Sequence, residues 1–149
     1  MITEKIEALN REAQQFNEEL NKGISDDEIR VFNLQANMKL KFSFPEEYTN
    51  SLKVINGFDF NGCVLYGIDE EYLITPPNQT DIGAIDNNLV WQELNEPNYI
   101  FLGDENMSWF VYDRISMSFR MLDKPSATKL EEYLTFEELF EKILDMALN

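Results

Sequence analysis

The chain reads Phe44-Pro45-Glu46-Glu47-Tyr48-Thr49-Asn50-Ser51-Leu52-Lys53-Val54-Ile55-Asn56-Gly57 and, shortly afterwards, Leu65-Tyr66-Gly67. The first run has the signals of a short helix, because Ser43 precedes it as a cap and proline is tolerated in a first turn. Tyr48, Leu52 and Ile55 would form its buried face. Asn56-Gly57 ends it, since glycine accepts the left-handed conformation that a helix end often needs. The apolar run over residues 63–66 then predicts a strand.

Two further helices are expected before this run. Apolar side chains recur at alternating spacings of four and three from Ile2 to Leu20, which predicts an amphipathic helix over residues 2–22 that ends near Gly23. We expect this helix to lie on its own domain, because three heptads are too few to indicate a coiled coil; a partner-binding or dimerising helix is the alternative. Ser25-Asp26-Asp27-Glu28 is a capping box that starts the second helix. The apolar face of that helix is Ile29, Phe32, Ala36 and Leu40.

Short extended segments dominate after residue 60. Residues 72–75 are expected to be extended and closed by Pro76-Pro77, and residues 82–95 to form a helix with Ile85 and Leu89 inward, joined by Gln92 or Leu94. Consecutive antiparallel strands are expected at 99–102, 109–112 and 116–122. In the last strand, Met117, Phe119 and Met121 alternate with Ser118 and Arg120, which predicts one buried and one solvent-exposed face.

A third capping box, Thr135-Phe136-Glu137-Glu138, starts the closing helix. Its apolar face is Phe136, Leu139, Phe140, Ile143, Leu144 and Ala147. Helices therefore lead and close the chain, with hairpin-connected strands between them, and this grouping indicates an α+β fold. No linker or low-complexity tract divides residues 1–149, so we expect one domain in which residues 1–23 are a helical extension.

The composition excludes several chemistries. The chain has 149 residues with a net charge of −16, yet 44% of them are hydrophobic, which is typical of a folded protein. It has no histidine, which excludes Ser-His-Asp and Cys-His sites, zinc sites built on histidine, and an imidazole pH switch. Its one cysteine, Cys63, cannot form an internal disulfide, and we expect a packed, unreactive thiol.

No targeting or membrane segment is expected. The start Met1-Ile2-Thr3-Glu4-Lys5-Ile6 is charged where a signal peptide would be apolar. No apolar run approaches transmembrane length. These features predict a cytoplasmic protein without a membrane partner.

Acidic residues are concentrated in one part of the chain. Between Lys53 and Arg114 lie sixty residues with eleven Asp or Glu and no Lys, Arg or His, and we call this stretch the cation-free window. The window also contains Trp91 and Trp109, so it is expected to be folded structure. Such a surface repels nucleic acid and acidic membranes and attracts basic partners.

The run from Phe44 to Gly57, followed by Leu65-Tyr66-Gly67, resembles the SUKH superfamily. That family has a Leu-Pro-x-x-Tyr helix start, an apolar helix ending in Asn-Gly, and a Leu-Tyr-Gly strand. The closing Leu134-Thr135-Phe136-Glu137-Glu138-Leu139 resembles its final helix, and the chain looks closest to the SMI/YrhA-like branch. Phe44 stands where leucine is usual, and the N-terminal helix is an addition. The resemblance implies an α+β fold with a central antiparallel sheet flanked by helices. The residues that match the signature and are given structural roles by it are Pro45, Tyr48, Asn56, Gly57, Tyr66 and Gly67.

The resemblance also implies a bacterial immunity protein that binds and neutralises a cognate polymorphic toxin, such as a nuclease. A nuclease holds phosphates in a basic groove, and a compact acidic surface can occupy that groove. The candidate partner-binding residues lie in the cation-free window, with aromatic side chains as anchors beside the acids. They are Asp59, Asp69, Glu70, Glu71, Tyr72, Asp104, Glu105 and Trp109, with Trp91 as a further aromatic candidate. For each acidic cluster alone the alternative is solubilising surface, and for each tryptophan it is the core.

Two other functions remain open. An intracellular adaptor or regulator would use the same binding physics on a partner that is not a toxin, and a toxin gene beside this one would separate the two. A carboxylate enzyme or metal-binding protein would use Asp104, Glu105 and Asp113, which flank one predicted hairpin. No calcium loop, phosphate-binding glycine loop or nucleophile elbow supports it. We therefore expect no catalysis, cofactor or metal, and the oligomeric state stays open.

Overall fold

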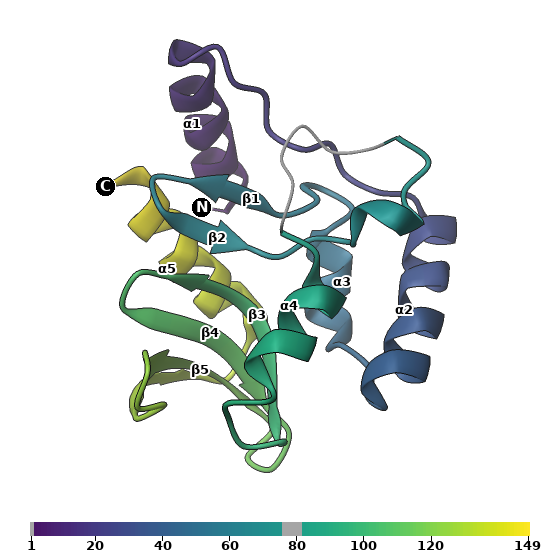
Figure 1. The fold of residues 1–149 in the computed structure, drawn as a ribbon. Coiled ribbons are helices and arrows are strands. Elements are labelled where there is room, and N and C mark those ends of the chain that lie inside the picture. Colours follow the sequence, from purple (N-terminus) through teal and green to yellow (C-terminus); the bar gives the residue numbers. More distant parts are fainter. Residues whose placement is uncertain (1, 76–81) are drawn as a thin grey trace.

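The computed structural model describes residues 2–75 and 82–149, and its fold is α+β (Figure 1). Within these residues six strands form one antiparallel sheet in which each strand pairs with the next along the chain. The strands are β1 Phe58–Phe60, β2 Cys63–Leu65, β3 Tyr99–Glu105, β4 Ser108–Asp113, β5 Ser118–Asp123 and β6 Lys129–Tyr133. The three central hairpin strands lie where the sequence predicts them, whereas β1 and β6 were not predicted.

Helices lie against both faces of the sheet. Helix α5 (Phe136–Leu148) packs on one face, where the rings of Phe119 and Phe136 are 5.7 Å apart. Helix α4 (Ala84–Trp91) packs on the other, where the rings of Trp91 and Trp109 are 5.4 Å apart. Trp109 pairs with Leu122, three residues from Phe119, so the two rings point to opposite faces. We refer to these as the α5 face and the α4 face.

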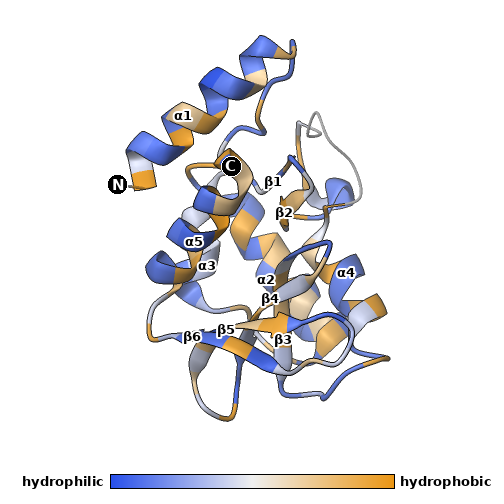
Figure 2. Ribbon diagram, turned by 90° about the vertical axis from the view of Figure 1, so that its left-hand side faces the viewer, coloured by the Kyte–Doolittle hydropathy of each residue, from blue (hydrophilic) through white to orange (hydrophobic). Residues whose placement is uncertain are grey.

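The N-terminal helix packs on its own domain but is shorter than predicted. Helix α1 (Ile2–Gln15) lies against α5, and Lys5 Nζ is 2.8 Å from a carboxylate oxygen of Asp145. The predicted span of 2–22 is wrong because Asn17 adopts a left-handed φ of 58°, and the Glu18 N–H bonds the Ala13 carbonyl, which closes the helix. Figure 2 shows α1 as largely hydrophilic, as expected of a helix with one buried stripe.

The next two helices follow the predicted pattern with one difference. The capping box starts α2 (Asp26–Leu40), since the Glu28 N–H donates to Ser25 Oγ over 3.2 Å. The four apolar residues predicted to face inward from α2 are all buried, as are those of α3 (Glu46–Ser51) and the turn after it. The predicted cap at Ser43 is wrong. Pro45 occupies the N-cap of α3, and the Ser43 hydroxyl bonds the Asn37 amide instead.

The segment 72–75, expected to be extended, begins at the end of a 3₁₀ turn. Glu70–Tyr72 forms a 3₁₀ turn, η1, closed by the Leu73 N–H bonding the Glu70 carbonyl. No strand forms at residues 72–75, although Leu73 itself is extended. Pro76-Pro77, predicted to close this segment, lies outside the described residues.

Helix α4 differs most from its prediction. It is shorter than 82–95. Leu89, expected inward, is 43% exposed, and Leu94, expected inward as an alternative to Gln92, is 72% exposed, whereas Ile85 is buried as predicted. Asn88 is buried instead, and its side-chain amide donates to the Phe101 carbonyl over 2.8 Å while its Oδ1 accepts from the Phe101 N–H over 2.7 Å. Strand β2 pairs with β3 only at Gly103 and Asp104, so the Phe101 backbone needs another partner. Asn88 supplies it.

Strand β5 and helix α5, near the end of the chain, agree more closely with their predictions. Thr135 Oγ1 accepts the Glu138 N–H over 3.3 Å, and all six apolar residues predicted for α5 are buried. In β5, Phe119 and Met121 are buried as predicted, but Met117 is 72% exposed because it lies in the preceding turn with φ of 57°. Ser118, expected on the solvent-exposed face, is buried, and its hydroxyl donates to the Glu132 carboxylate.

Candidate functional site

The residues of the SUKH-like signature form a buried junction between α3 and the sheet. Tyr48 Oη donates to the Tyr66 carbonyl over 2.6 Å, and Asn56 Oδ1 accepts the Ile68 N–H over 2.8 Å. A Cβ on Gly67 would lie 2.5 Å from the Asn56 carbonyl oxygen, so only glycine fits this crossing. These contacts fix the path of the chain just before residue 69.

Asp69 is a structural residue at the start of α4. Its Oδ1 accepts the Ile85 N–H and its Oδ2 accepts the Asp86 N–H, each over 2.9 Å, so it caps the helix from outside. Burial raises the pKa of the Asp69 carboxyl, although these two N–H groups lower it. Asp69 is only 2% exposed, so it is mainly a structural residue, although it also lines the hollow described next.

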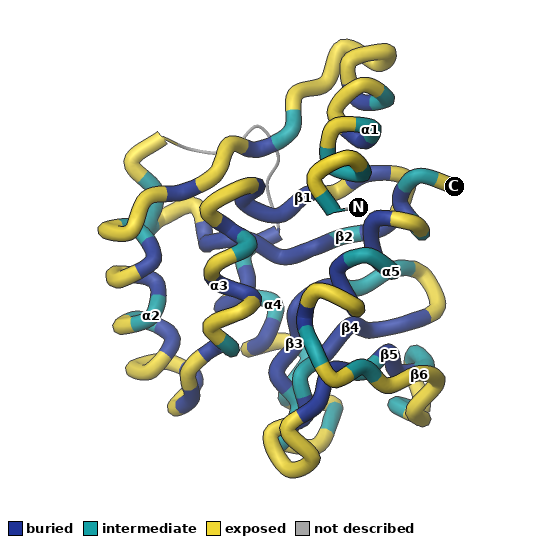
Figure 3. The backbone as a smooth tube through the Cα atoms, turned by 180° about the vertical axis from the view of Figure 1, so that it is seen from behind, coloured by how far each residue is buried: buried dark blue, intermediate teal, exposed yellow. Residues whose placement is uncertain are grey.

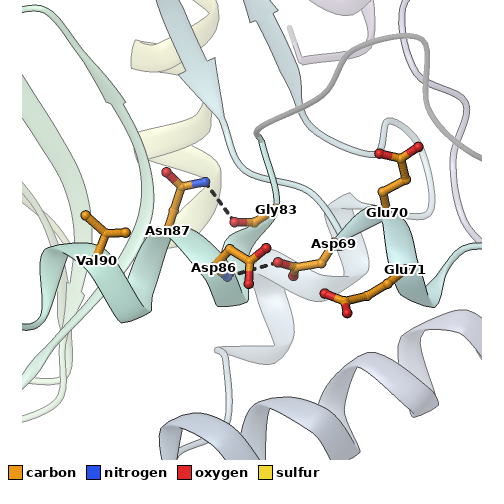
Figure 4. A pocket seen from close by; sticks show the side chains of 7 residues that line it. All are labelled: Asp69, Glu70, Glu71, Gly83, Asp86, Asn87 and Val90. Carbon is orange, nitrogen blue, oxygen red and sulfur yellow. Dashed lines mark hydrogen bonds between the residues drawn. The ribbon is translucent and has the colours of Figure 1, made fainter.

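The neighbouring acids surround an open hollow of about 540 Å³ beside Asp69 (Figure 4). Glu70 and Glu71 reach it from η1, while Asp86 and Val90 reach it from α4. We call Asp69, Glu70, Glu71, Asp86 and Val90 the α4 acidic pocket. Val90 is 55% exposed, so the pocket offers apolar surface beside its carboxylates.

One cation borders this pocket although none is near it in sequence. Lys39 of α2 donates from Nζ to the Tyr72 hydroxyl over 2.7 Å. That hydrogen bond raises the pKa of Lys39 against its partial desolvation, and the charges of Glu71 and Asp86 raise it further. Tyr72 thus lies at the edge of the pocket, held by Lys39, and is half-buried.

The carboxylates of the pocket are close enough to act on one positive charge. Oxygens of Asp69, Glu71 and Asp86 lie within 4.8 Å of one another. Such a set can receive a guanidinium or ammonium group, and oxygen ligands of this kind also suit a hard divalent cation.

A second polar cluster lies at the other end of α4. Trp91 Nε1 donates to the Tyr66 hydroxyl over 2.8 Å, and that hydroxyl donates to Asp104. Lys124 Nζ is 3.6 Å from the Asp104 carboxylate and lies 5.2 Å and 5.7 Å from the ring centroids of Trp91 and Trp109. Trp109 is 2% exposed, so its prediction as a surface anchor is wrong; it belongs to the core.

The remaining candidate acids lie on and beside β1 and β3. Asp59 and Asp104 both align with Val64 of β2, which places them on one face of the sheet. Burial raises the pKa of Asp59, and the charges of Asp104 and Glu18 raise it further. Glu105 accepts the Met107 N–H over 3.1 Å and so closes the β3–β4 turn. These residues do not line the α4 acidic pocket.

The acids proposed for a cation site do not converge. Asp113 pairs with Tyr99 at the start of β3, whereas Glu105 pairs with Ser108 at its end. Strands rise about 3.4 Å per residue, so these carboxylates are separated by most of the strand length. Asp113 is also committed to Arg120, whose Nη1 lies 3.1 Å from it. Burial acts to raise the pKa of Asp113, but hydrogen bonds from Asn98, Ile115 and Ser116, together with Arg120, outweigh it and lower that pKa.

The chain was compared with models of protein families and with curated proteins. No protein-family model matches it, and no curated protein does. Among the described helices, none combines the length and apolar character needed to cross a bilayer.

The cation-free window is therefore not free of cations in space. Lys39, Arg120 and Lys124 reach it from outside, and Asp104 and Asp113 form ion pairs with two of them. Sequence reasoning placed Asp86 only as one of the window's eleven acids and missed Val90 and Lys39. A signal for Asp86 existed, because an acid in the first turn of a helix is favourable and therefore frequent there.

Proposed function

We propose that this protein is an immunity protein that binds a basic surface of a cognate toxin domain through the α4 acidic pocket and so neutralises the toxin. The observation that carries the proposal is the exposure of Glu70, Glu71 and Asp86 around one hollow that also exposes Val90. The SUKH-like signature supports the toxin as partner. The proposal of a toxin as partner rests on that resemblance, and the proposal of a basic surface on the toxin rests on the charge of this face.

The physical argument is electrostatic complementarity with an apolar centre. A toxin that acts on nucleic acid needs cationic side chains to hold phosphates, and acids in the pocket can pair with them. A net charge of −16 also attracts a basic domain from a distance and speeds association. Val90 and its exposed neighbour Leu89 supply apolar contact, which a binding face needs at its centre.

Isothermal titration of the protein against the toxin domain encoded beside it tests the proposal. We expect Glu71→Lys to weaken binding by about 30-fold or more, because the reversal both removes a pair and adds repulsion. Glu7→Lys on the exposed side of α1 is the matched control, since it changes net charge equally but lies in another part of the chain. Including EDTA separates direct pairing from a bridge through a divalent cation.

The possible outcomes divide clearly. Absence of any binding to the toxin domain refutes the immunity function and favours an adaptor with another partner. Equal weakening by Glu71→Lys and Glu7→Lys shows that net charge alone matters and refutes the pocket as the contact. Affinity that is independent of salt between about 50 and 300 mM refutes the electrostatic mechanism.

A further inference from the structure

Helix α2 has apolar side chains on two opposite faces. Ile29, Phe32, Ala36 and Leu40 are buried against the domain. Val31, Leu34 and Met38 point the other way and are 41%, 59% and 58% exposed. At 100° per residue this second stripe lies on the side of the helix opposite the buried one. Figures 1 and 3 show α2 at the edge of the molecule, with exposed positions along its outer side.

The outer stripe continues at the same spacing into charged residues at both ends. Within α2, Asp27, Val31, Leu34 and Met38 have spacings of four, three and four, which is the seam of a helix that packs on another helix. Lys41 follows three residues later as the C-cap of the helix, with a φ of 65°. An isolated exposed leucine needs no explanation, but three large apolar residues in a seam bounded by opposite charges do.

We infer that this seam is an interface between two copies of the chain, with the α2 helices antiparallel about a two-fold axis through Leu34. In that arrangement Leu34 meets its own copy, Val31 lies beside Met38 of the partner copy, and Asp27 lies beside Lys41 of the partner copy. A parallel arrangement would instead place Asp27 beside Asp27 and Lys41 beside Lys41. Antiparallel helix dipoles also favour the first arrangement.

The distribution of charge favours a second copy of the chain as the partner that binds this seam. The whole chain carries −16, so two copies repel each other over most of their surface. Residues 26–41 are an exception, because their three acidic and three basic residues balance. The acids Asp26, Asp27 and Glu28 lie in the first turn, while Lys39 and Lys41 lie at the end. Lys39 bonds Tyr72 and Asp26 pairs with Lys53, so the charges that bound the seam are Asp27 near one end and Lys41 at the other. These two make the seam self-complementary when turned by 180°.

The contact predicts a weak, reversible dimer. One helix from each protomer buries less than the area of about 800 Å² per partner that stable complexes have. We expect dissociation near about 100 µM, which sedimentation velocity between about 10 µM and 1 mM resolves. The wild-type mass should rise towards the dimer with concentration. A wild-type chain that stays monomeric at about 1 mM overturns the inference.

Substitution at the axis tests the location. Leu34→Lys places two like charges together and should leave a monomer throughout this range, with unchanged circular dichroism because the side chain is exposed. Ile115→Lys is the matched control: Ile115 is 79% exposed in the β4–β5 turn, and its variant should dimerise as the wild type does. A Leu34→Lys variant that dimerises like the control refutes the seam.

A charge swap tests the direction. Asp27→Lys alone or Lys41→Asp alone should each weaken dimerisation about fivefold, because each creates two like-charge pairs across the axis. The double variant restores opposite charges and should return to within about twofold of the wild type. A double variant weaker than both singles excludes the antiparallel pairing. Thermal melts of all variants at low concentration show whether each monomer remains folded.

Discussion

Replacing Asn88 by alanine should be among the most destabilising single changes in this protein. Asn88 is 0% exposed and lies in α4 against β3. Its side chain bonds both the N–H and the carbonyl of Phe101, and it also donates to the Ala84 carbonyl over 2.7 Å. Asn88→Ala leaves the two Phe101 groups buried without their partner.

The expected loss follows from the cost of orphaned polar groups. Each buried, unsatisfied group costs about 1–3 kcal/mol, and incomplete additivity gives a total of about 3–5 kcal/mol. This is a large share of the roughly 5–15 kcal/mol by which a domain is stable. For a chain of this size it corresponds to a fall in Tm of about 8–15 °C.

Urea denaturation followed by tryptophan fluorescence measures this loss, since Trp91 is the last residue of α4 and packs on Trp109 of the sheet. Asn88→Leu distinguishes hydrogen bonding from packing: it fills the space but leaves Phe101 unpaired, so it should remain within about 1 kcal/mol of Asn88→Ala. Asn10→Ala on the exposed side of α1 is the control and should change stability by less than about 0.5 kcal/mol. Full stability in Asn88→Leu would refute the reasoning, because the lost quantity would then be volume.

Three further predictions concern glycine, cysteine and a buried carboxylate. In urea denaturation, Gly57→Ala should lower the free energy of unfolding by about 2 kcal/mol more than Gly62→Ala. Both glycines have positive φ, but only at Gly57 would a Cβ meet backbone, 2.5 Å from a carbonyl oxygen. Equal losses would show that φ alone matters. Burial, and then the charges of nearby acids, raise the pKa of Cys63 to about 12. At pH 8 a disulfide reagent should therefore leave the thiol unmodified until the chain unfolds. Rapid reaction of the native protein would contradict the burial of Cys63. The pKa of Asp113 is lowered on folding, so its charge stabilises the fold above the ordinary carboxyl range and that contribution disappears as pH falls below it. Asp113→Asn should therefore be less stable than wild type at pH 7 and nearly equal at about pH 2, and a constant difference would exclude this linkage.

Local signals in the sequence predicted the elements whose stability is local. The capping residues Ser25 and Thr135 start the helices expected of them, since a cap and a periodic apolar face lie within a few residues of each other. The predicted hairpins also formed. By contrast β6 is an edge strand with exposed positions at four of its five residues, so no apolar alternation marks it. Strand β1 has only three residues, too few to show a period.

The errors in α4 and at the candidate site come from contacts that sequence distance hides. Asn88 is buried because β3 has an unpaired backbone there, and nothing in residues 84–91 reveals the state of a strand. Asp69 resembles Glu70 in sequence, yet it caps a helix that starts fifteen residues later, at Ala84. The Lys39 and Lys124 side chains enter the cation-free window only through folding. Composition therefore identified an acidic stretch of the sequence but not which acids in it face solvent.

This distinction changes what the acidity of the chain means for binding. Charges farther apart than about 8 Å are largely screened at physiological salt, so the net charge of −16 acts mainly on the rate of approach and mainly at low ionic strength. Contacts made after approach depend on acids that are close together and exposed. Asp104 and Asp113 are paired with cations of the same chain, whereas Glu70, Glu71 and Asp86 share one open hollow. Reversing any exposed acid should then slow association at low salt, but only reversals at the hollow should speed dissociation of a basic partner, because those alone remove a contact.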